Sequence, residues 1–196
     1  EKKLIEGIEK IVPGSSFTAE ESGIQQKNSA YHWIIDPLDG TTNFIHNIPH
    51  YCISIGLQFE NKLMAGWVYE ICTDEMYTAI KGEGAFLSLP SQGRRKKIEV
   101  SKTDNLHKCL IATGFPVHSY QKLDEYLNLL KFMIENTRGV RRLGTAAYDL
   151  CMLASGRVDA YYEPGLSSWD LAAGAIIVQE AGGKVTDFAG GEEYLE

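Results

Sequence analysis

Two aspartates three positions apart, Asp36 and Asp39, are the residues of this chain best suited to carry chemistry. They follow the apolar run 33–35 within the stretch Trp-Ile-Ile-Asp-Pro-Leu-Asp-Gly-Thr-Thr-Asn-Phe, residues 33–44. The carbonyl of Leu38 can turn toward the same side as the two carboxylates. Ligands that are all oxygen suit Mg²⁺ or Mn²⁺ rather than zinc. The spacing therefore indicates a site for a hard divalent cation.

Gly40 and Thr41 follow this acidic pair directly. Their backbone N–H groups and the threonine hydroxyl could hold an anion, especially where a short helix begins. The alternative without chemistry is a strand, an Asp-Pro turn and a helix cap. The two aspartates, the turn and the apolar strand together favour an anion site beside a cation site.

The elements that position these groups can be predicted from the spacing of apolar residues. Residues 33–35 are typical of a strand covered on both faces, and Pro37 cannot donate a ladder hydrogen bond, so we expect this strand to stop at Asp36. Ligands collect outside such strand ends in open α/β sheets. The patterns predict antiparallel strands at about 53–59, 63–69 and 76–80, and helices at 4–12, 123–134, 145–155 and 170–181. This mixture predicts a layered α/β protein.

The formal net charge is −7 at pH 7. Nucleic-acid binding depends mainly on Lys and Arg that neutralise phosphates, so this charge argues against it. The basic cluster 94–97 is short, and we expect a solvated turn between strands there. We therefore predict no nucleic-acid partner.

Compartment and domain organisation follow from cysteine use, apolar runs and length. The cysteines form no Cys-x-x-Cys pair and are expected to be buried free thiols in a reducing compartment: Cys52, Cys72, Cys109 and Cys151. No apolar run is long enough to cross a bilayer and no leader-like segment opens the chain, so we predict a cytoplasmic protein without a membrane partner. The length suits one core or two packed halves, about 1–115 and 116–196.

Residues 36–44 resemble the central signature of the inositol monophosphatase family, and residues 169–174 with 180–183 resemble its C-terminal signature. Residues 17–22 resemble its Gly-Glu-Glu turn, with Ala19 in place of the usual glycine. Because similarity runs along nearly the whole chain, the chain is identified as a member of this family. The resemblance implies alternating α, β, α, β, α layers, a homodimer and inhibition by Li⁺. It also implies one catalytic core over 1–196 that lacks the family's terminal segments.

The metal ligands are implied by the same resemblance. The positions that match the family's ligands are Glu20, Asp36, the Leu38 carbonyl, Asp39 and Asp170, and they would hold two or three Mg²⁺ ions, with Mn²⁺ as a substitute. Glu20 matches the glutamate that also helps to activate water, and Asp36 matches the aspartate that bridges metals. The alternatives are an exposed acidic turn for Glu20 and an N-cap of the helix from residue 171 for Asp170.

The substrate contacts are also implied by resemblance. Thr41 matches the hydroxyl that orients water together with Glu20, and the N–H groups of Gly40 and Thr41 would hold phosphate oxygens. Glu163 matches the carboxylate that binds ring hydroxyls of inositol, and Ala146 matches a wall of that pocket. The alternative for Glu163 is the end of a strand.

These residues together imply a Mg²⁺-dependent phosphate monoester hydrolase, most closely an inositol-1-monophosphatase, in which water attacks phosphorus directly. Histidinol-phosphate phosphatase and fructose-1,6-bisphosphatase activities stay open, because one contact such as Glu163 cannot fix which polyol is held. A regulatory binding protein that uses a non-catalytic surface is the alternative from another class. The family also has an acidic residue upstream of helix 4–12, and without it we expect a weak third metal site and slow turnover.

Overall fold

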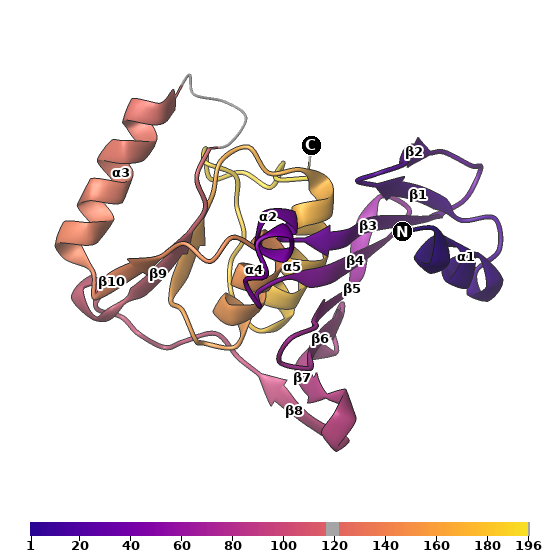
Figure 1. Ribbon diagram of the computed structural model, residues 1–196, viewed down its shortest axis with the longest axis horizontal. Helices are drawn as coiled ribbons and strands as arrows, with labels where there is room; N and C mark the ends of the chain where they lie inside the picture. The colour runs from indigo at the N-terminus through magenta and orange to yellow at the C-terminus, as the bar shows by residue number, and fades with distance from the viewer. Residues whose placement is uncertain (117–121, 196) are drawn as a thin grey trace.

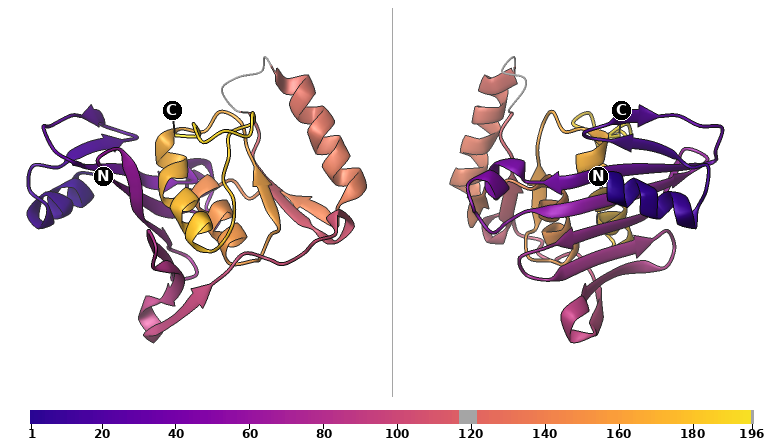
Figure 2. Two further views of the ribbon diagram at one scale, coloured as in Figure 1. Left: turned by 180° about the vertical axis from the view of Figure 1, so that it is seen from behind. Right: turned by 45° about the vertical axis from the view of Figure 1, so that its right-hand side comes forward.

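The protein is built in layers (Figures 1 and 2). The computed structural model describes residues 1–116 and 122–195. Helices α4 (Ala146–Ala154) and α5 (Ser168–Glu180) lie between two sheets. Helix α1 (Lys2–Ile11) covers the outer face of the larger sheet, and α3 (Leu123–Asn136) lies outside the smaller one. The order is α, β, α, β, α, which confirms the predicted fold class.

The larger sheet has eight strands in the order β2-β1-β3-β4-β5-β6-β7-β8. Their bounds are β1 Ser16–Ala19, β2 Gly23–Gln25, β3 Tyr31–Asp39, β4 Cys52–Phe59, β5 Lys62–Glu70, β6 Glu75–Ile80, β7 Gly84–Leu89 and β8 Arg94–Ile98. Strands β1 and β3 run parallel, and the other neighbouring pairs run antiparallel. The smaller sheet is parallel, in the order β10 (Gly139–Arg141), β9 (Leu110–Thr113), β11 (Ala160–Tyr162). Short helices complete the chain: α2 Thr41–Ile45, η1 Pro90–Gln92 and η2 Leu106–Lys108.

The predicted strands at 53–59, 63–69 and 76–80 are confirmed by β4, β5 and β6. The prediction of a solvated turn at residues 94–97 is wrong, because these residues form most of the edge strand β8, paired with β7. All four side chains are exposed, and charged side chains on an edge strand discourage pairing with other chains. The four positive charges therefore protect a sheet edge.

Strand β3 does not stop at Asp36 as predicted but continues through Pro37 to Asp39. The register with β4 shifts between the two aspartates, so that Pro37 and Leu38 oppose a single residue of β4. This is a β-bulge, where a proline costs no ladder hydrogen bond. Without it, residues three apart would point to opposite faces of the sheet. The bulge therefore turns both carboxylates to the same side.

Helix α5 lies very close to the larger sheet because glycines face it. A Cβ atom added to Gly66 of β5 would lie 2.6 Å from the carbonyl oxygen of Ala173, and one added to Gly56 of β4 would lie 2.7 Å from Cβ of Ala172. The helix is buried on nearly all sides, as expected for a layer between two sheets. This close packing brings the beginning of α5 to β3.

A buried carboxylate, Glu75, joins α4 and the partly exposed Arg157 that follows it to the larger sheet. Glu75 of β6 is 8% exposed and accepts hydrogen bonds from the hydroxyls of Tyr77 and Tyr148, each at 2.8 Å, and pairs with Arg157. Burial alone would raise the pKa of Glu75, but the hydrogen bonds from Arg157 and the tyrosines outweigh it and hold that pKa below its usual value. This network holds α4 in place against β6.

We expect Arg157→Ala to lower the free energy of unfolding by about 3 kcal/mol, because it leaves the Glu75 carboxylate buried without a counter-ion. Urea unfolding measures the loss. The matched control is Lys27→Ala, which breaks the exposed 3.0 Å pair with Glu9 and should cost less than about 1 kcal/mol. Equal losses in the two variants would contradict the prediction.

The cysteines are free thiols, as predicted. Cys52 and Cys151 are buried as predicted, whereas Cys109 is only half-buried and Cys72 is exposed, so the prediction of burial is wrong for Cys72. The physical reason is that Cys72 lies in the turn between β5 and β6, outside the layers. In the described part of the chain, no helix has both the length and the apolar character needed to cross a membrane.

Candidate metal and phosphate site

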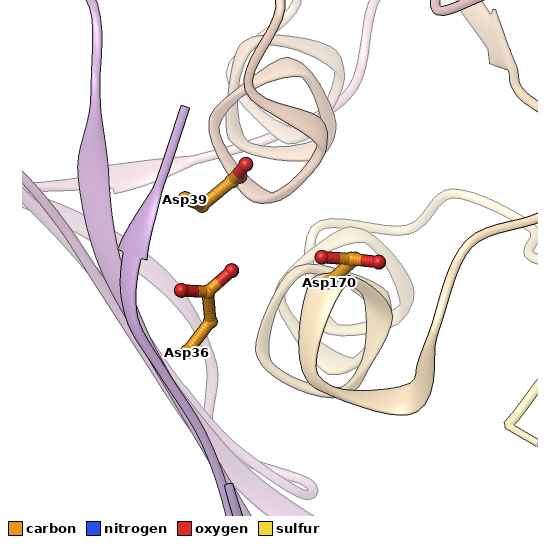
Figure 3. Close-up of side chains that lie close together, drawn as sticks. All are labelled: Asp36, Asp39 and Asp170. Carbon is orange, nitrogen blue, oxygen red and sulfur yellow. The ribbon is translucent and has the colours of Figure 1, made fainter. Parts of the chain in front are cut away.

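Three aspartates predicted as metal ligands come together in the structure. Asp36 and Asp39 on β3 and Asp170 on α5 each place a carboxylate oxygen within 4.8 Å of the others. Figure 3 shows the three side chains pointing toward one another across the space between strand and helix. Asp36 is 2% exposed and Asp39 is 8% exposed, whereas Asp170 is half-buried. The group therefore lies inside the protein, with Asp170 at its solvent side.

The charges of this group are poorly compensated by the protein itself. Burial, followed by the negative charge of Asp39, raises the pKa of Asp36 to about 9, and the charges of Glu20 and Asp170 act in the same direction. Burial also raises the pKa of Asp39 to about 7, although a backbone hydrogen bond from Ala147 opposes the change. A divalent cation would supply the missing positive charge, and the oxygen-only donor set suits Mg²⁺. The residues present therefore fit such an ion.

Hydrogen bonds to the backbone fix the two aspartates of β3. Asp36 Oδ1 accepts from the N–H of Leu38 at 2.8 Å, within the bulge. Asp39 Oδ2 accepts from the N–H of Ala147 at 2.8 Å and from the thiol of Cys52 at 3.8 Å. The N–H of Ala147 is one of those at the start of α4 that have no partner within the helix. Asp39 therefore also anchors the beginning of α4.

Asp170 occupies a different place in its helix from the one predicted. Helix α5 begins at Ser168, earlier than expected, and its N-cap is Ser167 rather than Asp170. The two residues form a capping box, in which Asp170 Oδ2 accepts from the N–H of Ser167 at 2.7 Å. Serine and an acidic residue three positions later satisfy each other's backbone N–H groups, which is why the helix starts there. The box fixes the Asp170 carboxylate at the helix end that faces β3.

The glycine-threonine turn lies directly beside the aspartates. Gly40 has φ 92° and is the N-cap of α2, a conformation that favours glycine. A Cβ atom there would overlap the side chain of Thr145 at the start of α4. The hydroxyl of Thr41 donates to the carbonyl oxygen of Leu38 at 3.0 Å. Its hydrogen is therefore engaged, and its oxygen can accept a hydrogen bond from another group.

Glu20 is exposed at the end of β1 and is not part of the compact group. Its backbone N–H donates to the carbonyl of Ile35 at 3.2 Å, and the parallel pairing of β1 with β3 places it next to Asp36. Its charge contributes to the raised pKa of Asp36. The structure thus places Glu20 beside the site without bringing its carboxylate among the three aspartates.

Glu163 faces the same region from the smaller sheet. The hydroxyl of Tyr161 donates to its Oε2 at 2.5 Å, and the carboxyl group lies directly against Gly114. Burial raises the pKa of Glu163, which Tyr161 and Arg142 oppose, and its charge in turn raises the pKa of Asp39. Glu163 is therefore held rigidly, close enough to the aspartates to act on them.

One further buried carboxylate near the aspartates was not identified from the sequence. Asp149 on α4 is 1% exposed, and in the described part of the chain neither its oxygens nor the hydroxyl of Thr145 has a hydrogen-bond partner. Burial, then the charges of Glu163 and Asp39, raises the pKa of Asp149 to about 8. The sequence signal for Asp149 was an acidic residue within an otherwise apolar helix. Ala146, at the beginning of the same helix, is 6% exposed.

The chain is similar to known proteins along its whole length. The model of the inositol monophosphatase family matches residues 1–196. The Nus factor SuhB of Pseudomonas aeruginosa is 43% identical over 201 residues, covering 100% of this chain and 72% of that protein. The inositol-1-monophosphatase of Mesorhizobium japonicum is 40% identical over 190 residues, covering 96% of this chain and 69% of that protein.

Solved structures agree with these sequence matches. The extragenic suppressor protein suhB of Bartonella henselae is similar with a TM-score of 0.91 at 40% identity, covering 98% of this chain and 72% of that one. The IMPase of Thermotoga maritima is similar with a TM-score of 0.85 at 35% identity, covering 97% and 70%. Together with the match over the entire chain, they show that the protein belongs to the inositol monophosphatase family.

Proposed function

We propose that the protein is a Mg²⁺-dependent phosphate monoester hydrolase whose substrate class is inositol monophosphate. The observation that carries this proposal is the buried group of Asp36, Asp39 and Asp170, with carboxylate oxygens within 4.8 Å of one another and pKa values raised at both β3 positions. Membership of the family supports it.

The ion ligands in this proposal are the three aspartates, the Leu38 carbonyl and Glu20. Bound Mg²⁺ would neutralise phosphate charge and lower the pKa of a water molecule. The Leu38 carbonyl already accepts a hydrogen bond from Thr41, but a carbonyl oxygen has two lone pairs and can serve both. Glu20 is exposed at the end of β1, and its carboxylate would turn toward the three aspartates when the ion binds.

The remaining residues orient the reactants. The Thr41 hydroxyl donates to Leu38, so its oxygen accepts a hydrogen bond from the attacking water, and Glu20 receives the proton. The N–H groups of Gly40 and Thr41 hold phosphate oxygens. Glu163, fixed by Tyr161, accepts hydrogen bonds from the polyol hydroxyls, and Ala146 forms a wall of that pocket. Water attacks phosphorus directly while the P–O bond to the polyol breaks and the leaving oxygen takes up a proton from water, so the products are the alcohol and phosphate and no side chain becomes phosphorylated.

Phosphate release from a panel of esters tests the proposal. The panel contains inositol 1-phosphate, histidinol phosphate, fructose 1,6-bisphosphate and an adenosine bisphosphate, each with Mg²⁺ and with excess EDTA. We expect release that requires Mg²⁺ and is fastest with inositol 1-phosphate. If another ester reacted faster, that ester would replace inositol 1-phosphate as the proposed substrate. If none of the esters released phosphate, the proposal would be overturned.

Gly114→Ala should impair the polyol contact selectively. A methyl group there would occupy the place of the Glu163 carboxyl group, which must move away. We expect KM for inositol 1-phosphate to rise about tenfold, because a hydrogen bond to a charged group is worth about 1.5–3 kcal/mol. Steady-state kinetics measure it, with Gly7→Ala as control, since a Cβ atom at Gly7 meets nothing within 4 Å. An unchanged KM would show that Glu163 does not contact the polyol.

A regulatory role is a second candidate, favoured by the relatives named Nus factor SuhB. Such a role would use a surface away from the aspartates. If Asp36→Asn left a biological effect intact, that effect would depend on the surface rather than on the ion site. The absence of a nucleic-acid partner stays a prediction. The name Nus factor, which these relatives carry, favours a macromolecular partner in addition to a small-molecule substrate. The homodimer, the cytoplasmic location and the Li⁺ inhibition also stay predictions.

A further inference from the structure

Asn43 joins two segments that are distant in the sequence. It lies in α2 and is 6% exposed. Its Nδ2 donates to the carbonyl oxygen of His50 at 2.9 Å and to the carbonyl oxygen of Leu143 at 2.9 Å. Both acceptors are backbone carbonyls, which cannot donate, so the side chain must present its NH₂ group to them. The amide thus uses both of its hydrogens to hold two separate backbone segments.

The two segments carry different parts of the proposed site. Asn43 follows Thr41 by two positions, so it is fixed to the turn that holds phosphate and orients water. Leu143 comes three residues before Ala146, which begins α4 and forms the proposed wall of the polyol pocket. The hydrogen bond from Asn43 to Leu143 therefore links the segment that would hold the phosphate to the segment that would line the polyol pocket.

The seam between these segments is closely packed. A Cβ atom on Gly144 would lie 3.2 Å from Asn43 Nδ2, and one on Gly40 would overlap the side chain of Thr145. Next to them, the N–H of Ala147 donates to Asp39. Because Gly40 packs against Thr145 and Gly144 packs against Asn43, little room is left between α2 and the beginning of α4. These contacts set the distance between the two segments.

We propose that Asn43 is a positioning residue that fixes the separation between the phosphate-binding turn and the polyol-binding wall. It thereby determines preference for substrates that are held at both ends. The inference rests on the proposed function. Because Asn43 is 6% exposed and its Nδ2 is already engaged with two backbone carbonyls, it acts by fixing where Ala146 lies relative to the turn.

The test compares two phosphate esters with Asn43→Ala. Inositol 1-phosphate needs both ends of the site, whereas p-nitrophenyl phosphate has no hydroxyl groups and needs only the phosphate end. We expect kcat/KM for inositol 1-phosphate to fall at least about tenfold, mainly through KM, because a displacement of about 1 Å can cost a factor of about 10². We expect kcat/KM for p-nitrophenyl phosphate to stay within about twofold, since the bonds from Thr41 to Leu38 and from the N–H of Phe44 to Gly40 do not involve the Asn43 side chain.

Asn43→Asp provides a second variant of nearly the same shape if the alanine variant does not fold. Its carboxylate cannot donate to His50 or Leu143, so we expect the same change in substrate preference. The matched control is Asn136→Ala, which removes an amide that donates to a backbone carbonyl at 2.8 Å on α3, away from the site. Circular dichroism establishes that each variant is folded.

A merely structural role would lower both activities in proportion to the folded fraction and leave their ratio unchanged. An unchanged ratio in the folded variants, with an active wild type, would overturn this inference alone. A wild type that hydrolyses neither ester would overturn the proposed function, and this inference would fall with it.

Discussion

Asp36→Asn is expected to reduce Mg²⁺-dependent phosphate release by about three orders of magnitude or more. Asp36 is 2% exposed and has a carboxylate oxygen within 4.8 Å of oxygens of both Asp39 and Asp170, so an ion in this group would lose one of its buried charged ligands. Asparagine keeps the shape and one oxygen, and the carbonyl can still accept from the N–H of Leu38. The loss should therefore come from the missing charge. Phosphate release under saturating Mg²⁺ measures it.

The same substitution should stabilise the metal-free protein. At neutral pH the Asp36 carboxyl is ionised in the unfolded chain but protonated in the metal-free folded protein, so folding must take up a proton, and asparagine removes this cost. Thermal unfolding in EDTA should therefore show a higher Tm for Asp36→Asn than for the wild type. Asp104→Asn, at an exposed position, is the matched control and should change neither quantity. A loss of activity accompanied by a lower Tm would indicate misfolding and would contradict this explanation.

Mg²⁺ binding at neutral pH is expected to release on the order of one proton per molecule. Burial, with the neighbouring charge of Asp39, raises the pKa of Asp36 from 3.8 to about 9, so this group is protonated at pH 7 in the metal-free protein. Only the ionised carboxylate binds the ion well. Calorimetric titration with Mg²⁺ in two buffers of different ionisation enthalpy measures the protons released. Equal heats in the two buffers would contradict the expectation.

The stability of the metal-free protein should depend on pH through the same group. Because the pKa of Asp36 is higher in the folded than in the unfolded chain, the folded state binds more protons between the two values. The contribution is fully present below a pH of about 4 and is lost as the pH rises toward 9. Subtracting the curve of Asp36→Asn isolates this contribution from those of other groups. A difference that grows in favour of the wild type at high pH would have the wrong sign.

The sequence predicted the elements with strong periodicity well. Alternating and helical patterns located β4 to β6 and the helices α3 to α5, because burial of one face imposes those periods. The error at β3 arose from Pro37, since a proline ends a regular strand but fits in a bulge, and a bulge has no local signature. The N-cap of α5 was placed at Asp170 rather than Ser167 because both residue types can cap a helix.

The candidate site was predictable as far as local motifs reach. The proximity of Asp36 and Asp39 followed from their spacing, and that of Asp170 followed from the family resemblance. The burial of Asp149 and the bond from Asn43 to Leu143 could not be predicted, because they depend on how α4 packs between the sheets. No pattern within either segment indicates a partner 100 residues away.

The separation of the three aspartates along the chain has a consequence for how the protein is made. Asp36 and Asp39 leave the ribosome roughly 130 residues before Asp170, and all strands of the larger sheet are synthesised before α5. During this interval the growing chain carries two acidic groups beside an apolar sheet face that α5 does not yet cover. The ion site is completed only when α5 docks, so tight Mg²⁺ binding would report the last step of folding rather than the formation of the sheet.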